Sequence, residues 1–303
     1  MATCAGMEGI FTGPLDRSAP RIGAVIVAGS GPTDANGNNR LSGRSDNLRL
    51  IAGALATQGI ASIRYDKRGV GRSAAGAPPE AAMTIETSAE DAGLWVQWLS
   101  RRLEGRPVAL VGHSEGALIA CLAAQLQQIA TLVLLAAPGR PLGEILRQQI
   151  ERHVPPDLAQ KALTVLAELI AGRRVYSIDP ALANLFRPSV QPFLISSLVR
   201  DPAFELASFG GPALIIGGGR DEQVSRDDFD ALAAAKIAAR ALWLPTMNHM
   251  LKDINESAAA SVDPALALAS GLADAITAHI LDAAPRLSQF SRPEIGSRSP
   301  DRG

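Results

Sequence analysis

A serine within a Gly-x-Ser-x-Gly pentapeptide is the first candidate for chemistry in this chain. The pentapeptide, Gly112-His113-Ser114-Glu115-Gly116, lies between an apolar strand-like run at 107–111 and a helix-like run at 117–126. The two glycines have no side chains, so a strand and a helix can approach closely around a tight turn. A serine on that turn lies at the N-terminus of the helix, where backbone N–H groups favour developing negative charge. The context predicts a nucleophile, whereas the pentapeptide alone also occurs in ordinary strand-to-helix turns.

The chain offers four histidines as a base for the serine, which is a weak nucleophile without one. His249 follows the last strand-like run in a short loop, and the carboxyl ends of parallel strands meet at one edge of a sheet. His113 adjoins the serine but is expected to point elsewhere, His153 lies in the segment at 138–210 that interrupts the alternation, and His279 lies in a helix interior. His249 is therefore the predicted base.

A carboxylate is needed to orient that histidine and to stabilise its charged form. Asp221 is the first acid after the strand-like run at 213–217, and the adjacent Glu222 is expected to point away. Asp227 and Asp228 are typical of a helix N-terminus, and Asp253 follows the histidine. Asp221 is the predicted third member, which places the three residues at the ends of separate strands.

The oxyanion of a tetrahedral intermediate needs two backbone N–H donors. Glu115 supplies one as the residue after the nucleophile. The second should come from the glycine-rich loop after the first core strand, where we expect the N–H of Ser30, with Gly31 as the second choice. The alternative for this loop is a plain glycine turn without exposed donors.

The elements that must position these residues alternate along the chain. Strands are predicted at 22–28, 60–65, 107–111, 131–137, 213–217 and 241–244, and helices at 46–58, 85–103, 114–128, 226–237 and 263–281. Apolar strands that alternate with helices indicate an α/β fold with a mostly parallel sheet covered on both faces.

One segment interrupts the alternation. Residues 138–210 hold helix-like pieces at 142–152 and 157–171, followed by several prolines, and predict a helical insertion that serves as a lid or as a functionless excursion. The core domain is then 7–137 and 211–283. Residues 284–303 are rich in Ser, Arg, Pro and Gly and predict a disordered tail.

The composition excludes several classes of partner. Lys and Arg number 29 against 30 Asp and Glu, so no charge bias favours nucleic acid or an anionic membrane. No run reaches the roughly 20 apolar residues that span a bilayer, and the first residues do not resemble a secretory signal. Cys4 and Cys121 indicate neither a disulfide framework nor a metal site. We expect a cytoplasmic protein without metal or cofactor that acts on a small molecule.

The motifs together resemble the α/β-hydrolase superfamily, and more closely its bacterial serine esterases and serine-aminopeptidase-like hydrolases. The resemblance spans about residues 7–283 and is carried by the segments 29–39, 64–73, 112–116, 221–224 and 248–249. It implies a hydrolase fold with a helical lid and an acyl-enzyme mechanism on short-chain or aryl esters. Thioesterase or aminopeptidase chemistry would use the same residues, and a non-catalytic binding protein is a further alternative.

The chain also departs from the family's pattern. Relatives generally carry Asp-Arg-Asp-Gly-Asn where this chain has Asp34-Ala-Asn-Gly-Asn, and a second glycine where it has Ala117. The first antiparallel strand of the family's sheet is expected to be missing or abbreviated, because little chain precedes the first core strand. In the charged segment 64–73, Asp66 and Arg68 are expected to brace a tight turn at Gly69–Gly71, rather than to take part in chemistry.

Overall fold

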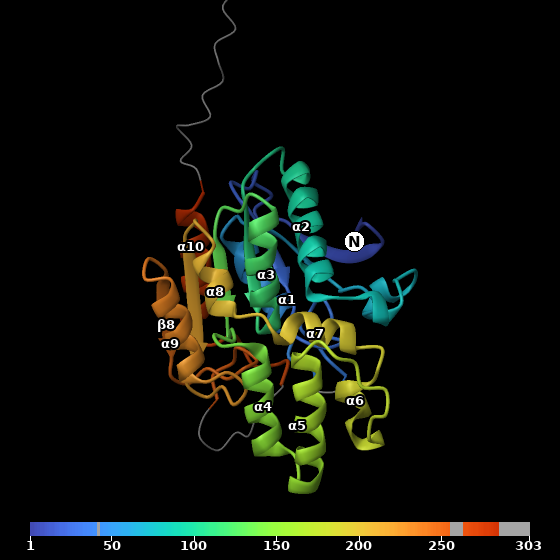
Figure 1. The fold of residues 1–303 in the computed structure, drawn as a ribbon. Helices are drawn as coiled ribbons and strands as arrows, with labels where there is room; N and C mark the ends of the chain where they lie inside the picture. The colour runs from blue at the N-terminus through green and yellow to red at the C-terminus, as the bar shows by residue number, and fades with distance from the viewer. Residues whose placement is uncertain (41–42, 255–262, 285–303) are drawn as a thin grey trace, which may run out of the picture.

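The computed structural model describes residues 1–40, 43–254 and 263–284. Their centre is an eight-stranded sheet of order β1-β2-β4-β3-β5-β6-β7-β8, in which β2 pairs antiparallel with both β1 and β4 and all other neighbouring strands pair in parallel (Figure 1). The strands are β1 (Ala2–Cys4), β2 (Met7–Thr12), β3 (Gly23–Val27), β4 (Ala61–Tyr65), β5 (Val108–His113), β6 (Leu132–Leu135), β7 (Ala213–Gly218) and β8 (Arg240–Leu244).

The middle strands are buried on both faces, as their mostly apolar sequences predict. Every residue of β3, β4, β5, β6 and β7 is buried. The register pairs Val27 of β3 with Gly112 of β5, and His113 of β5 with Leu135 of β6. The end of β5, and with it the predicted nucleophile, therefore lies in the middle of the carboxyl edge.

Helices cover the sheet from both sides. One face packs against α2 (Ile85–Arg102), α3 (Glu115–Leu126), α8 (Pro202–Ala207) and α9 (Arg226–Ala235). The other packs against α1 (Asn47–Thr57) and α10 (Leu272–Asp282). Each face carries its own cluster of fully buried side chains, with Trp95 and Leu118 in one and Ile51 and Ile276 in the other. The fold is an α/β sandwich of three layers, as predicted.

One expected boundary needs correction. The last helix begins at Leu272 and not at Asp263, because Gly271 adopts a φ of 77° and the residues before it form turns. The first antiparallel strand is present but abbreviated to three residues, as one of the two expected alternatives, and it pairs with β2. No strand was predicted over β2. Most of its residues are only partly buried, and its position is set by antiparallel pairing with the distant strand β4.

A helical insertion, α4 to α8, interrupts the alternation between β6 and β7. Its first members are α4 (Leu142–His153), α5 (Pro156–Ile170), α6 (Ala183–Phe186) and α7 (Gln191–Leu198). Figure 1 shows α4, α5 and α6 extending beyond one end of the sheet, with α7 between them and α2. The insertion has an apolar cluster of its own, which includes Ala162, Leu166, Leu169 and Phe186.

Two further findings concern membrane-spanning helices and the C-terminal tail. Among the described residues, no helix combines the length and the apolar character that crossing a membrane requires. The predicted tail, apart from its first residue, Ala284, lies outside the described residues.

Candidate active site

Ser114 lies on a strained turn between β5 and α3. Its backbone φ of 54° and ψ of −126° fall in a region that residues other than glycine rarely adopt. The flanking glycines are required by space: a Cβ on Gly112 would lie 2.3 Å from the Gly116 carbonyl oxygen, and one on Gly116 would lie 2.4 Å from the Val27 carbonyl oxygen. The turn therefore presents the serine at the sheet edge, while its N–H donates to the Leu135 carbonyl at 2.9 Å.

His249 lies in the loop after β8, and its Nε2 is 3.1 Å from the Ser114 Oγ. That distance is within the reach a base needs. The loop is held by Asn248, whose Oδ1 accepts from the Lys252 N–H at 2.9 Å and whose own N–H donates to the Lys252 carbonyl at 2.9 Å. His249 is buried, so its ring has a fixed place beside the serine.

Asp221 completes a hydrogen-bonded chain from the loop after β7. Its Oδ2 lies 2.8 Å from the His249 Nδ1, and its Oδ1 accepts from the N–H groups of Gln223 at 2.8 Å and Val224 at 2.9 Å. Glu222 is exposed and turned to solvent. The structure thus brings together Ser114, His249 and Asp221 and separates the neighbouring acid from them.

The hydrogen-bond partners of the His249 ring determine which of its nitrogens carries the proton. A carboxylate only accepts hydrogen bonds, so the His249 Nδ1 carries the proton and its Nε2 is free to accept the Ser114 hydroxyl proton. An imidazole in this tautomer, beside a hydroxyl on a helix N-terminus, can act as a general base for nucleophilic attack.

The remaining histidines lie outside this chain of contacts. His113 is buried and its Nε2 donates to the His249 carbonyl at 2.8 Å, so it supports the loop of the base rather than the serine. Burial lowers the pKa of His113 to about 4, which keeps the ring neutral. His279 is buried in α10 against Thr131, and His153 is exposed at the end of α4.

The three predicted oxyanion donors belong to two segments, the start of α3 and the loop after β3. Glu115 is the first residue of α3, while Ser30 and Gly31 follow β3 and are exposed. No hydrogen bond occupies the N–H groups of these three residues within the described part of the chain. A Cβ on Gly29 would lie 3.2 Å from the Ser114 Cβ, so the peptide of Gly29 and Ser30 runs directly past the serine.

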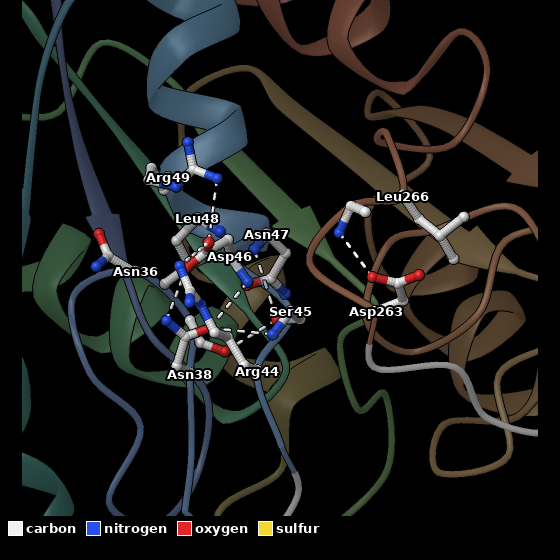
Figure 2. A network of polar contacts seen from close by, with 12 residues as sticks. Asn36, Asn38, Arg44, Ser45, Asp46, Asn47, Leu48, Arg49, Asp263 and Leu266 are labelled. Carbon is white, nitrogen blue, oxygen red and sulfur yellow. Dashed lines mark hydrogen bonds and ion pairs between the residues drawn. The ribbon is translucent and has the colours of Figure 1, made fainter.

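The segment after this loop is fixed by a dense polar network (Figure 2). The Asp34 Oδ1 accepts from the N–H groups of Asn36 and Asn38, and the Asn38 Oδ1 accepts from Ser45 and Asp46. Asp46 has a φ of 52° and pairs with Arg44 and Arg49. The hydrogen bonds of Asp46 with Asn38, Arg44 and Arg49 lower the pKa of its carboxyl against the effect of burial. Of the two residues that depart from the family's pattern, Ala35 donates its N–H to the Asp66 Oδ1 at 2.7 Å, and the Asn36 Oδ1 accepts from the Arg64 Nε at 3.2 Å.

In the charged segment after β4, Asp66 and Arg68 make different contacts. The Asp66 Oδ2 accepts from the Arg72 N–H at 2.9 Å and so braces the turn, as expected. Arg68 does not brace it: its guanidinium contacts both carboxylate oxygens of Asp91 on α2, at 2.8 to 3.0 Å. The reason is reach, because the long side chain extends across to the neighbouring helix.

The helical insertion lies next to the loop after β7 that carries Asp221. Arg140 forms a two-pronged ion pair with the buried Asp228 of α9, with contacts of 2.9 and 3.1 Å. A cavity of about 80 Å³ lies between α4 and this loop, lined among others by Gln148, Asp221 and Glu222. The start of the insertion is thereby fixed within reach of the site.

Sequence reasoning missed two lysines at this edge: Lys67, which is mostly buried, and Lys252, which is fully buried. The Lys67 Nζ donates to the Gly29 carbonyl at 2.6 Å, and the Lys252 Nζ donates to the Leu266 carbonyl. Each lies in a segment that follows a strand at the carboxyl edge, which is the signal that could have indicated a role near the site. No group of three or more His, Cys, Asp or Glu among the described residues is placed to hold a metal ion.

Comparison with known proteins gives the family. A family model described as serine aminopeptidase, S33, matches residues 35–279. The chain is also similar to the esterase EstD of Thermotoga maritima, at 30% identity over 259 residues, which are 82% of this chain and 59% of EstD. The match therefore spans less than two thirds of that relative.

Two solved esterase structures share the architecture. Est1E from Butyrivibrio proteoclasticus, with ferulic acid bound, superposes with a TM-score of 0.60 at 14% identity, covering 93% of this chain and 97% of Est1E. A thermophilic esterase from Thermogutta terrifontis, with malate bound, gives 0.58 at 17% identity, covering 92% and 95%. Likeness at such identities concerns the fold alone. By the match of the family model over most of its length, the chain belongs to the serine aminopeptidase S33 family of α/β-hydrolase proteins.

Proposed function

We propose that this protein is a serine hydrolase that cleaves carboxylic esters through an acyl-enzyme, with Ser114 as nucleophile, His249 as base and Asp221 as its orienting acid. The observation that carries the proposal is the continuous hydrogen-bonded chain from the Asp221 carboxylate through the imidazole to a serine on a strained turn. The similarity to the esterase EstD supports ester substrates. Small short-chain or aryl esters are the proposed class, and the chemistry needs neither metal nor cofactor.

Acylation begins with attack of the Ser114 Oγ on the ester carbonyl carbon as the His249 Nε2 takes the hydroxyl proton. The carbonyl electrons move onto the oxygen, and the N–H groups of Ser30 and Glu115 bind the resulting oxyanion. The bond to the alcohol oxygen then breaks, and His249 returns its proton to the departing alcohol. Throughout, the Asp221 Oδ2 accepts from the Nδ1–H and stabilises the charged imidazole.

Deacylation repeats these steps with water. His249 removes a proton from the water as its oxygen attacks the acyl carbon, and the same two N–H groups hold the second oxyanion. Collapse breaks the bond to the Ser114 Oγ, which regains a proton from His249. The carboxylic acid leaves, and the enzyme returns to its starting state.

The insertion is the proposed wall of the substrate site. In this division the core comprises 7–137 and 211–283, and the lid comprises 138–210. Support comes from the cavity that α4 shares with the loop of Asp221 and from the ion pair of Arg140 with Asp228 at the base of the insertion. An apolar wall there would exclude water and bury the non-reacting part of an ester.

An aminopeptidase-like activity is the second candidate, because the family model carries that description. A panel of short and medium aliphatic esters, a feruloyl ester, acyl thioesters and aminoacyl amides separates the candidates. The feruloyl ester is included because Est1E was solved with ferulic acid bound. We expect the highest kcat/KM on an ester, lost in Ser114→Ala. Faster cleavage of an aminoacyl amide would favour the aminopeptidase instead, and no hydrolysis of any member would overturn the proposal.

A further inference from the structure

Lys67 is a mostly buried lysine at the carboxyl edge of the sheet that the proposed reaction leaves unused. It follows β4 by two residues, and its side chain is 15% exposed. While Asp66 and Arg68 contact the turn and α2, Lys67 extends to the site. Its Nζ lies 2.6 Å from the Gly29 carbonyl oxygen and 3.7 Å from the Glu115 Oε1.

The contact with Gly29 bears directly on the proposed oxyanion donor. The Gly29 carbonyl and the Ser30 N–H belong to one planar trans peptide and point in opposite directions. An anchor on the carbonyl therefore sets the direction of the N–H. Glycines at 29 and 31, the latter with a φ of 66°, leave this loop little intrinsic preference for one orientation. The anchor supplies the restraint that the local sequence lacks.

The second contact reaches the residue that carries the other proposed donor. The Glu115 carboxylate is 13% exposed, and its Oε1 has no hydrogen-bond partner within the described part of the chain, so Lys67 is its nearby counter-charge. Burial lowers the pKa of Lys67, and the charge of Glu115 opposes that shift. Burial likewise raises the pKa of Glu115 against the effect of Lys67. One ammonium thus binds the carbonyl of the Gly29–Ser30 peptide and lies near the side chain of Glu115, so it contacts both segments that would supply the oxyanion donors.

We propose that Lys67 is a positioning residue that holds the peptide between Gly29 and Ser30 in the orientation in which its N–H stabilises the oxyanion formed at Ser114. The proposal rests on the proposed ester hydrolysis. It predicts a specific kinetic signature: the loss is in the transition state and not in the binding of the ground-state ester.

The test replaces Lys67 by methionine, which keeps the length of the side chain and removes the donor. Loss of a side-chain oxyanion donor costs about a hundredfold to a thousandfold in kcat, and a misaligned donor should cost less, about tenfold to a hundredfold. We expect that fall in kcat on an ester, with KM changed by less than about threefold. Lys67→Arg, which keeps a charged donor, should recover most of the lost activity.

The chain offers a matched control in Lys236. Its Nζ also donates to a backbone carbonyl, that of Phe209, at the end of α9 away from the serine. Lys236→Met removes the same kind of bond and should leave kcat within about twofold of the unmodified enzyme. If Lys67→Met does not fold, Lys67→Gln provides the second variant: its donor is uncharged and one atom shorter, so a smaller fall in kcat in the same direction is expected.

An inhibitor supplies a readout that a merely structural role would not move. Trifluoroacetophenone forms a tetrahedral adduct with a nucleophilic serine and places an oxyanion where the ester would. Its inhibition constant should rise in Lys67→Met by about the factor by which kcat falls. A folded Lys67→Met or Lys67→Gln enzyme with kcat and inhibition like those of Lys236→Met would overturn the positioning role alone. An unmodified enzyme without Ser114-dependent ester hydrolysis would instead overturn the proposed function and this role together.

Discussion

The carboxyl edge of the sheet and the helical insertion are built in different ways. At the edge, Ser114, Asp221 and His249 follow β5, β7 and β8 and are fixed by short hydrogen bonds to one another and to neighbouring backbone. The insertion packs around its own apolar cluster and joins the core both through apolar residues, such as Phe193 and Leu206, and through polar contacts. Among these contacts, Arg187 pairs with Glu80, and Arg200 pairs with Glu86 at 2.5 Å.

The difference indicates a division between fixed and variable parts. Partly exposed ion pairs contribute only about 0–1 kcal/mol each, so they add little to the apolar attachment of the insertion. The reacting atoms are held instead by parallel strands that are buried throughout. Chemistry should therefore depend on single residues of the edge, whereas selectivity should depend on the insertion and change by degrees.

The largest expected effect is at the serine. Ser114→Ala should remove almost all ester hydrolysis and leave the fold intact, because loss of a triad nucleophile costs on the order of a millionfold in turnover. The measurement is kcat on the best ester, with circular dichroism as the check on folding. If the pure variant retains more than about a tenth of the activity, the nucleophile lies elsewhere.

The second largest effect on kcat is expected at Asp221. Asp221→Asn should lower kcat by about ten-thousandfold, since an asparagine no longer fixes the required tautomer of His249. The adjacent Glu222 is exposed and gives the matched control, so Glu222→Gln should change kcat little. Equal, small losses in the two variants would mean that the acid is wrongly assigned.

The insertion should produce a moderate effect. Leu142 of α4 packs against the cluster of the insertion and against that of the sheet, and Phe193 of α7 packs against the sheet cluster. Leu142→Ala and Phe193→Leu should shift the ratio of kcat/KM on short and medium esters by about 10- to 200-fold at most, the range one methylene can discriminate. Leu166, fully buried inside the insertion, is the control: Leu166→Val should lower stability and leave the ratio unchanged. An unchanged ratio in all three variants would make the insertion purely structural.

The smallest effect concerns stability at low pH. His113 has a folded pKa of about 4 against an ordinary 6.5, so the unfolded chain binds the extra proton between these values. The free energy of unfolding should therefore fall as pH falls through that window. Between pH 7 and about 4.5, the unmodified protein should lose roughly 2 kcal/mol more than His113→Gln in urea unfolding. His153→Gln, at an exposed histidine, should follow the unmodified protein, and parallel curves for all three would refute a neutral, buried His113.

Elements that are set by local sequence could be predicted, whereas elements that are set by contacts between distant segments could not. Apolar runs and a fixed strand order carry local information, so the strands that precede Ser114, Asp221 and His249 could be placed to within two residues. The start of α10 could not, because Gly271 and the turns before it depend on packing against the loop of Leu251. β2 was missed for a similar reason, since its place is set by pairing with β4.

Contacts between distant segments escaped the sequence altogether. Arg68 was expected to brace its own turn but pairs with Asp91, and Lys67 was overlooked although it reaches Gly29. A long charged side chain can extend to any neighbour that the fold supplies, and that neighbour is unknown until the helices and loops are in place. The residue types at the sheet edge were predictable, while their supporting partners were not.

The most direct test of the account is to trap the acyl-enzyme. The enzyme would be mixed with an activated aryl ester, quenched in acid within the first turnovers, digested and analysed by mass spectrometry. We predict one acyl group on the peptide that contains Ser114, none in Ser114→Ala, and more trapped acyl-enzyme when the ester deacylates slowly. Hydrolysis that proceeds with no acyl group on that peptide, or with the group on another residue, would contradict it.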